Sequence, residues 1–130
     1  LDRLTKVIDP LLNEIERVHD KVGNLLSIED ATNQMTNFVY NALNQQTKVT
    51  DPGSNATNIL HDAMGNVVQT LDALGNPAWR AYDERGQLVL EVDARGGTTK
   101  YSYDAAGNLS VLTDPAGNVW QWQYDGLHRE

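Results

Sequence analysis

The feature that most constrains the fold of this chain is an unbroken internal period of 21 residues. If an aromatic residue or a histidine is taken as the start of each unit, an aspartate stands eleven residues after each start but the last. The unit starts are His19, Tyr40, His61, Tyr82, Tyr103 and Tyr124, and the aspartates, with one from a partial unit, are Asp9, Asp30, Asp51, Asp72, Asp93 and Asp114. So short a period predicts stacked copies of one supersecondary element, each stabilised by its neighbours.

A second aspartate column directly follows the unit start, with Asn41 in one unit. Its aspartates are Asp20, Asp62, Asp83, Asp104 and Asp125, and three residues after this column stand Gly23, Asn44, Gly65, Gly86, Gly107 and His128. Glycine, asparagine and histidine all tolerate positive φ. We therefore expect "DAAGN" (104–108) and "DPAGN" (114–118) to form the same type I turn with a G1 bulge. In each turn the aspartate side chain would accept a hydrogen bond from the backbone N–H two residues later.

The segments between these turns are typical of strands. Examples are "LVLEV" (88–92), "GTTKYSY" (97–103) and "NVWQWQY" (118–124), which are rich in β-branched and aromatic residues and often alternate. Each unit is thus predicted to be one hairpin, and the fold to be all-β, with tandem hairpins in a continuous curved antiparallel sheet. We expect residues 1–130 to form a single array of about six units. Because both ends fall inside a unit, we also expect an internal segment of a longer protein.

One segment, "DPLLNEIERVHDKV" (9–22), has apolar residues at helical spacing after an Asp-Pro pair. The apolar positions are Leu11, Leu12, Ile15, Val18 and Val22. Read alone, this segment favours an amphipathic helix. It nevertheless occupies the same positions of the repeat as "DPAGNVWQWQYD" (114–125), and the period continues after it without a slip. We therefore predict a strand there.

The unit, written Y-D-x-x-G-N/R-L, a strand, D-P-x-G-N and a second strand, resembles the YD repeat of RHS proteins. The same unit occurs in TcB/TcC insecticidal toxin subunits, in bacterial wall-associated proteins and in teneurins. The resemblance covers essentially the whole chain and is strongest in "YDAAGNLSVLTDPAGNVWQWQYD" (103–125). Earlier units depart from the pattern, since Asn44, Leu12 and Asn33 replace turn glycines and Gln46 replaces the leucine.

The resemblance implies that the repeats coil into one long sheet that spirals into a hollow shell around a C-terminal toxin domain. The implied partners are the remainder of the shell, the enclosed toxin domain and a component of a secretion apparatus. The implied location is outside the producing bacterial cell, after secretion or delivery, or otherwise the cell surface. The autoprotease of the family lies near a D-P-x-G-L motif, and because "DPAGN" (114–118) lacks that leucine, no catalytic residue is carried over.

The composition gives no sign of another chemistry. Ten Lys and Arg residues are scattered through a chain of net charge −8 without cysteine, so neither nucleic acid nor a thiolate metal site is expected. Eleven of the 18 acidic residues open turns, one per turn, whereas calcium needs several ligands in one loop. His19 and His61 fill the aromatic position and His128 the turn position. No enzyme motif is present, so we expect no cofactor, no metal, no catalytic residue and no membrane insertion by this segment.

The aromatic residues of the unit start have two interpretations. Tyr40, Tyr82, Tyr103 and Tyr124 recur at the repeat period, which favours a structural ladder across the strands. An exposed aromatic strip is also a surface for sugars or for a non-native polypeptide. Two classes of function follow: a passive shell that encapsulates a toxin, or an adhesion or carbohydrate-binding module of a cell surface. We favour the shell, because a ribbon of hairpins has two open faces and no second layer to cover them.

Overall fold

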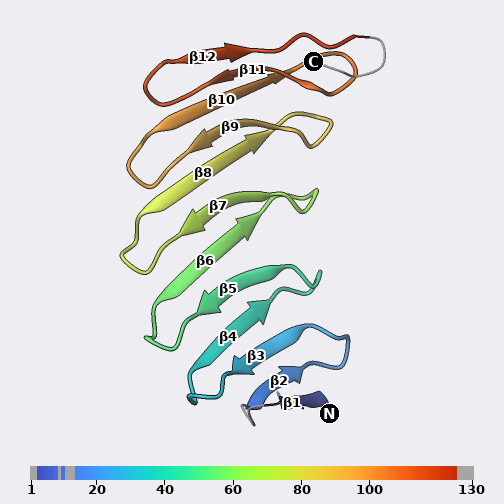
Figure 1. Cartoon of the computed structure of the whole chain (residues 1–130), viewed down its shortest axis with the longest axis vertical. Coiled ribbons are helices and arrows are strands. Elements are labelled where there is room, and N and C mark those ends of the chain that lie inside the picture. The colour runs from blue at the N-terminus through green and yellow to red at the C-terminus, as the bar shows by residue number, and fades with distance from the viewer. Residues whose placement is uncertain (1–2, 9, 11–13, 126–130) are drawn as a thin grey trace.

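The computed structural model describes residues 3–8, 10 and 14–125, and over these residues the predicted all-β fold is confirmed. Twelve strands form one open antiparallel sheet whose strand order equals their order in the chain (Figure 1). The strands are β1 (Arg3–Ile8), β2 (Glu14–His19), β3 (Leu25–Glu29), β4 (Met35–Tyr40), β5 (Gln46–Thr50), β6 (Ala56–His61), β7 (Val67–Leu71), β8 (Pro77–Tyr82), β9 (Leu88–Val92), β10 (Thr98–Tyr103), β11 (Leu109–Thr113) and β12 (Val119–Gln121). The sheet is therefore built from consecutive hairpins.

The strand prediction for residues 9–22 is confirmed over the described part, where β2 spans Glu14–His19. β2 pairs with β1 on one side and with β3 on the other. The two ladders satisfy its backbone and outweigh the local helical spacing, because intrinsic propensity is a weak preference that pairing overrides. Residues 9 and 11–13 lie outside the described residues, and with them Asp9.

The other predicted segments agree with the structure except at one end. The segment 88–92 coincides with β9, and 97–103 with β10. The predicted strand 118–124 is reduced to β12, Val119–Gln121, which has a neighbouring strand on one side only in the described sheet. The backbone N–H of Trp122 still donates a hydrogen bond to the carbonyl oxygen of Ser110, at 3.0 Å.

Each described hairpin from β2 onward is closed by the same five-residue turn. In the turn 104–108, the N–H of Gly107 donates to the carbonyl of Asp104 at 3.1 Å, and the N–H of Asp104 donates to the carbonyl of Asn108 at 2.9 Å. These two bonds define a type I turn with a G1 bulge, which requires positive φ at its fourth residue. The fourth residues, all with φ between +59° and +100°, are Gly23, Asn33, Asn44, Ser54, Gly65, Gly75, Gly86, Gly96, Gly107 and Gly117.

The turns fall into two sets, which lie at opposite ends of the strands. We call 20–24, 41–45, 62–66, 83–87 and 104–108 the first turns, and 30–34, 51–55, 72–76, 93–97 and 114–118 the second turns. Each hairpin closed by a first turn has a register shift before the turn, for example between Ala81 and Tyr82 in β8. The pairs closed by a second turn have none. A bulge bends a strand and increases its twist, so every hairpin bends at its first-turn end.

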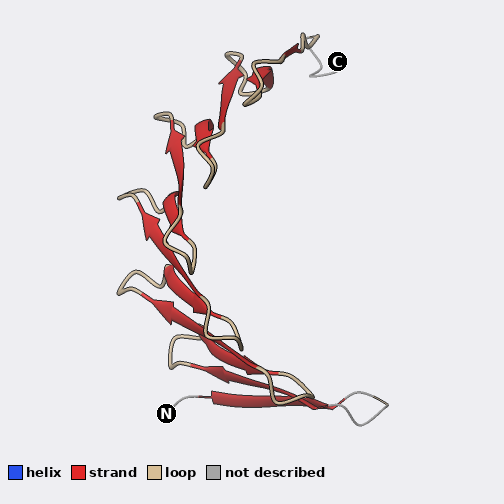
Figure 2. Cartoon of the chain, turned by 90° about the vertical axis from the view of Figure 1, so that its left-hand side faces the viewer, coloured by secondary structure: helices blue, strands red, loops and turns tan. Residues whose placement is uncertain are grey.

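The sheet is a single curved layer, seen as an arc in Figure 2. No hydrophobic side chain among the described residues is fully buried. The chain exposes 8993 Å² to solvent, whereas a compact monomer of this mass exposes about 6,800 Å². The fold therefore has no core of the globular kind, and its stability comes from ladders, turns and half-buried side chains.

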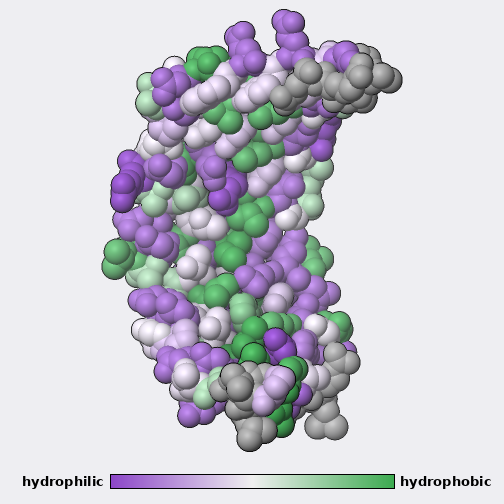
Figure 3. Space-filling view, viewed as in Figure 1, coloured by the Kyte–Doolittle hydropathy of each residue, from purple (hydrophilic) through white to green (hydrophobic). Residues whose placement is uncertain are grey.

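The two faces of the sheet differ in exposure. In the last four residues of β4, β6, β8 and β10, exposed and half-buried residues alternate, and the unit-start residue is always half-buried. Side chains converge on the inside of an arc and cover one another, which places the face of the unit-start residues on the concave side. Figure 3 shows the concave face, where hydrophobic side chains gather along the middle between polar margins.

Successive first turns also contact one another through side chains. Asn24 Nδ2 donates to Asn44 Oδ1 at 2.9 Å, and Gln87 Nε2 donates to the carbonyl of Gly107 at 3.1 Å. A Cβ atom at Gly107 would lie 3.3 Å from Gln87 Nε2, whereas one at Gly117, in a second turn, would have no neighbour within 4 Å. The first turns are therefore packed more tightly against one another than the second turns are.

This difference predicts unequal effects of two otherwise matched substitutions. Gly107→Ala and Gly117→Ala both place a side chain at positive φ, with φ of +91° and +84°, and each should cost about 1–2 kcal/mol for that reason. Gly107→Ala should cost more, because the new methyl group crowds Gln87. Hydrogen–deuterium exchange of the full-length protein measures how much amide protection each turn loses on substitution. Equal losses of protection in the two turns would contradict the tighter packing described for the first turns.

Candidate functional surface

The aspartate of each turn uses its carboxylate within its own turn. Asp104 Oδ1 accepts the N–H groups of Ala106 and Asn108 at 2.9 and 2.8 Å, and its Oδ2 accepts the Asn108 side chain at 2.9 Å. Asn41 makes the two backbone bonds with its amide oxygen, at 2.9 and 3.0 Å from Leu43 and Gln45. The same hydrogen bond, from the backbone N–H four residues later, is accepted by the carboxylates of Asp20, Asp30, Asp51, Asp62, Asp72, Asp83, Asp93 and Asp114.

These hydrogen bonds favour the ionised carboxylate. The side-chain bond from the asparagine four residues later lowers the pKa of Asp51, Asp62, Asp72, Asp104 and Asp114. The Thr32 side chain does the same for Asp30. At Asp20 partial desolvation raises the pKa, but the bonds from Asn24 and Val22 outweigh it, so the net shift is downward. The acidic residues of the turns thus stabilise the sheet.

The structure keeps the turn carboxylates apart. Within the described residues no group of three or more His, Asp or Glu side chains lies close enough to hold a metal ion. His19 and His61 stand at the ends of β2 and β6, whereas His128 lies outside the described residues. The described part also contains no helix that is long and apolar enough to cross a membrane.

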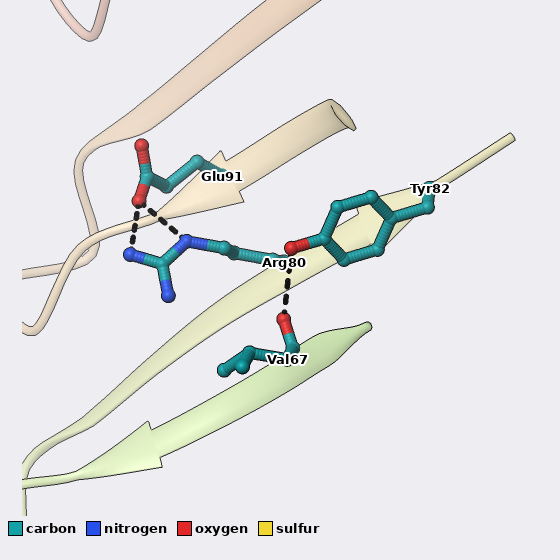
Figure 4. Close-up of polar contacts among 4 residues, drawn as sticks. All are labelled: Val67, Arg80, Tyr82 and Glu91. Atoms are coloured by element: carbon teal, nitrogen blue, oxygen red, sulfur yellow. Dashed lines mark hydrogen bonds and ion pairs between the residues drawn. The ribbon is translucent and has the colours of Figure 1, made fainter. Parts of the chain in front are cut away.

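Three of the four unit-start tyrosines make a specific hydrogen bond that the sequence did not reveal. The hydroxyl of Tyr82 donates to the carbonyl oxygen of Val67 on β7 at 3.1 Å (Figure 4). The hydroxyls of Tyr103 and Tyr124 donate to the carbonyls of Leu88 and Leu109, both at 2.9 Å. In each case the acceptor lies 15 residues earlier, on the neighbouring strand across a second turn. We call this bond the tyrosine bridge.

The tyrosine bridge fills a gap in the backbone ladder. β7 and β8 are in register only from Leu71–Pro77 to Gln69–Trp79. Beyond Trp79 the pairing of β8 with β7 ends while its pairing with β9 continues to Tyr82, so that the carbonyl of Val67 has no ladder partner on β8. An unpaired carbonyl is costly when it loses water. The Tyr82 hydroxyl supplies the missing donor and ties one hairpin to the next.

The other unit starts differ from this pattern. Tyr40 is half-buried at the end of β4, but its hydroxyl makes no such bond to a described residue. His19 and His61 each have a buried Nδ1 atom without a hydrogen-bond partner. At His19 the ladder with β1 continues to the Arg3–His19 pair, so there is no gap to fill. The tyrosine bridge is thus present in the C-terminal half of the described sheet.

The middle of the concave face holds one ion pair. Arg80 on β8 pairs with Glu91 on β9, with Nη2 and Nε at 2.8 and 3.0 Å from the same carboxylate oxygen (Figure 4). Burial, and then the neighbouring charge of Glu91, raise the pKa of Tyr101, so this tyrosine stays neutral. At the equivalent place in other hairpins, Phe38 pairs with Val49 and Ile59 with Thr70. In the hairpin β2–β3 the same place holds Arg17 opposite Ile28, so the concave face is mostly apolar or neutral with few charges.

Comparison with known proteins identifies the family. The RHS Repeat family matches residues 19–56, 82–119 and 105–130. These matches cover well over half of the chain, which therefore belongs to the RHS repeat family. No curated protein matches the chain.

Solved structures of larger proteins share the fold. The chain is similar to the crystal structure of TcdB2-TccC3-Cdc42, with a TM-score of 0.71 and 15% identity over 88% of this chain and 7% of that one. It is also similar to the Tc holotoxin pore of Photorhabdus luminescens carrying a TccC3 mutation, with a TM-score of 0.62 and 19% identity over 83% of this chain and 6% of that one. At these identities the likeness establishes the fold, and this chain spans less than a tenth of the chains it matches.

The turn geometry predicts that acid loosens turns opened by aspartate more than the turn opened by Asn41. The Asn66 side chain lowers the pKa of Asp62. The hydrogen bonds of Asp62 therefore stabilise the fold fully above its unfolded pKa of about 4, and this contribution is lost as the pH falls through the lower pKa of the folded state. The amide of Asn41 does not titrate. Amide hydrogen exchange, corrected for the intrinsic rates at each pH, should show turn 62–66 losing protection relative to turn 41–45 as the pH falls. A ratio of the two protection factors that does not change with pH would contradict this prediction.

Proposed function

We propose that this chain is one section of a hollow β-shell of the RHS type, which encloses a toxin polypeptide before delivery to a target cell. Its partners are the other repeats of the same shell, the C-terminal toxin domain inside it and a component of a secretion apparatus. The protein acts after secretion or delivery from a bacterial cell. This section contributes a wall and no catalytic residue.

The observation that carries the proposal is the curved, single-layered sheet without a core. The chain exposes 8993 Å², roughly a third more than the surface expected for a compact protein of its mass. Surface of this kind needs cover from other parts of a larger assembly. A continuation of the same curvature over many more hairpins would cover the concave face by closing a wall around an enclosed space.

The end strands support the same proposal. β1 and β12 each pair with one neighbour in the described sheet, so each has a row of backbone N–H and C=O groups without a ladder partner among the described residues. Such edges pair readily with further strands. In a shell these edges are occupied by the preceding and following units of the repeat, which have the same strand spacing and the same turn geometry.

The concave face suits a passive container. Its central side chains are mostly apolar or neutral, its acidic turns lie on the margins, and the Arg80–Glu91 charges neutralise each other. Such a surface can lie against a polypeptide of almost any sequence without a strong ionic contact. The proposal therefore requires no sequence-specific pocket for the enclosed chain.

Protease protection in the full-length protein tests the proposal. Under native conditions the segment that follows the repeats should resist proteinase K, whereas the same segment expressed without the repeats should be digested rapidly. A full-length variant that lacks one 21-residue unit, residues 82–102, is the matched test of wall integrity, because it keeps the period but changes the number of strands. Digestion of the following segment at equal rates with and without the repeats would overturn the proposal.

A further inference from the structure

We propose that the junction between β5 and β6 is a built-in opening point of the sheet, because His61 stands where a tyrosine hydroxyl bridges the three equivalent junctions that follow it in the chain. A junction is the boundary between two hairpins that are joined by a second turn. At each described junction a unit-start residue stands at or just after the end of the second strand. These junctions are β3–β4 (Tyr40), β5–β6 (His61), β7–β8 (Tyr82), β9–β10 (Tyr103) and β11–β12 (Tyr124). Tyr40 has the hydroxyl but makes no bridge to a described residue, whereas His61 is the one of the five that has no hydroxyl group with which to form it.

The backbone ladder at this junction stops early, as it does at the bridged junctions. β5 and β6 are in register from Thr50–Ala56 to Lys48–Asn58, and the last three residues of β6 have no partner on β5. By the repeat, the carbonyl that a bridge would reach is that of Gln46, 15 residues before His61. An imidazole ring is shorter than a phenol with its hydroxyl, and the buried Nδ1 of His61 has no hydrogen-bond partner.

A shallow surface hollow lies beside this junction, within the hairpin β6–β7. The hollow has a volume of about 190 Å³ and is lined by Asn58, Ile59, Leu60, Gln69 and Leu71. Ile59 and Leu60 belong to the part of β6 that has no partner on β5. The junction itself is held by three backbone pairs and has no tyrosine bridge.

Comparison with His19 shows that a histidine at the unit start leaves a junction without a needed hydrogen bond only at position 61. Both histidines fill the same position of the repeat and both have an unpartnered Nδ1. At His19, however, β1 and β2 remain paired along their whole length, to the Arg3–His19 pair. No gap exists there for a hydroxyl to bridge. At β5–β6 the gap exists and the bridge is missing, so the hairpins β4–β5 and β6–β7 can part while each stays intact.

Hydrogen–deuterium exchange of the full-length protein tests this inference. In the unmodified protein, amides of residues 59–61 should exchange faster than those of residues 80–82. His61→Tyr should slow exchange at 59–61 by about fivefold, which is the effect of one added hydrogen bond. His61→Phe, which restores a large aromatic ring without a hydroxyl, is the matched control and should not slow it comparably.

The reverse substitutions keep the inference falsifiable if a variant at position 61 fails to fold. Tyr82→Phe removes only the hydroxyl of a bridged junction and should speed exchange at residues 80–82 by about fivefold. Tyr82→His should make the β7–β8 junction behave like β5–β6. Equal exchange at 59–61 and 80–82 in the unmodified protein, equal effects of His61→Tyr and His61→Phe, or no effect of Tyr82→Phe would each overturn the inference.

Discussion

The five-residue turn is the constraint on which the rest of this structure depends. Its fourth residue must adopt positive φ, and its first residue must offer a side-chain oxygen to the N–H groups that the turn leaves unpaired. Because the turn recurs after alternate steps of ten and eleven residues, it fixes strands of five and six residues from β3 to β11. The strands tolerate both apolar and polar residues, as at the equivalent positions Phe38, Ile59 and Arg80, whereas the turn positions do not vary in this way.

The curvature and the tyrosine bridge follow from an asymmetry between the two turns of each unit. A register shift within the strand pair, in addition to the G1 bulge that all these turns share, accompanies every described first turn and no second turn. The register shift bends each hairpin at one end only, so successive hairpins separate at that end and a carbonyl is freed. The tyrosine at the unit start then has a structural role that phenylalanine could not fill. Its ring covers the concave face and its hydroxyl pairs the freed carbonyl.

The sequence predicts the turns better than the contacts between hairpins. Asp104 and Gly107 mark their turn because each residue type meets a local backbone demand, and local demands repeat with the period. The strand β2 could be predicted only because the period outweighed its helical spacing. The acceptor of the Tyr82 hydroxyl could not be predicted, because it is a backbone carbonyl freed by a bulge and no side chain marks it. For the same reason His19 and His61 look equivalent in sequence, although only His61 faces a gap.

Whether this sheet is a section of a larger wall is tested by the association state of the isolated 130 residues. In the described sheet β1 and β12 each have a neighbouring strand on one side only, and β12 carries Trp120 with 45% of its surface exposed. Exposed aromatic edge strands of this kind pair between molecules. Multi-angle light scattering over a range of concentrations should show the isolated chain self-associating, while the full-length protein keeps a single mass. A folded isolated chain that stays strictly monomeric at high concentration would show a self-contained domain and contradict the account.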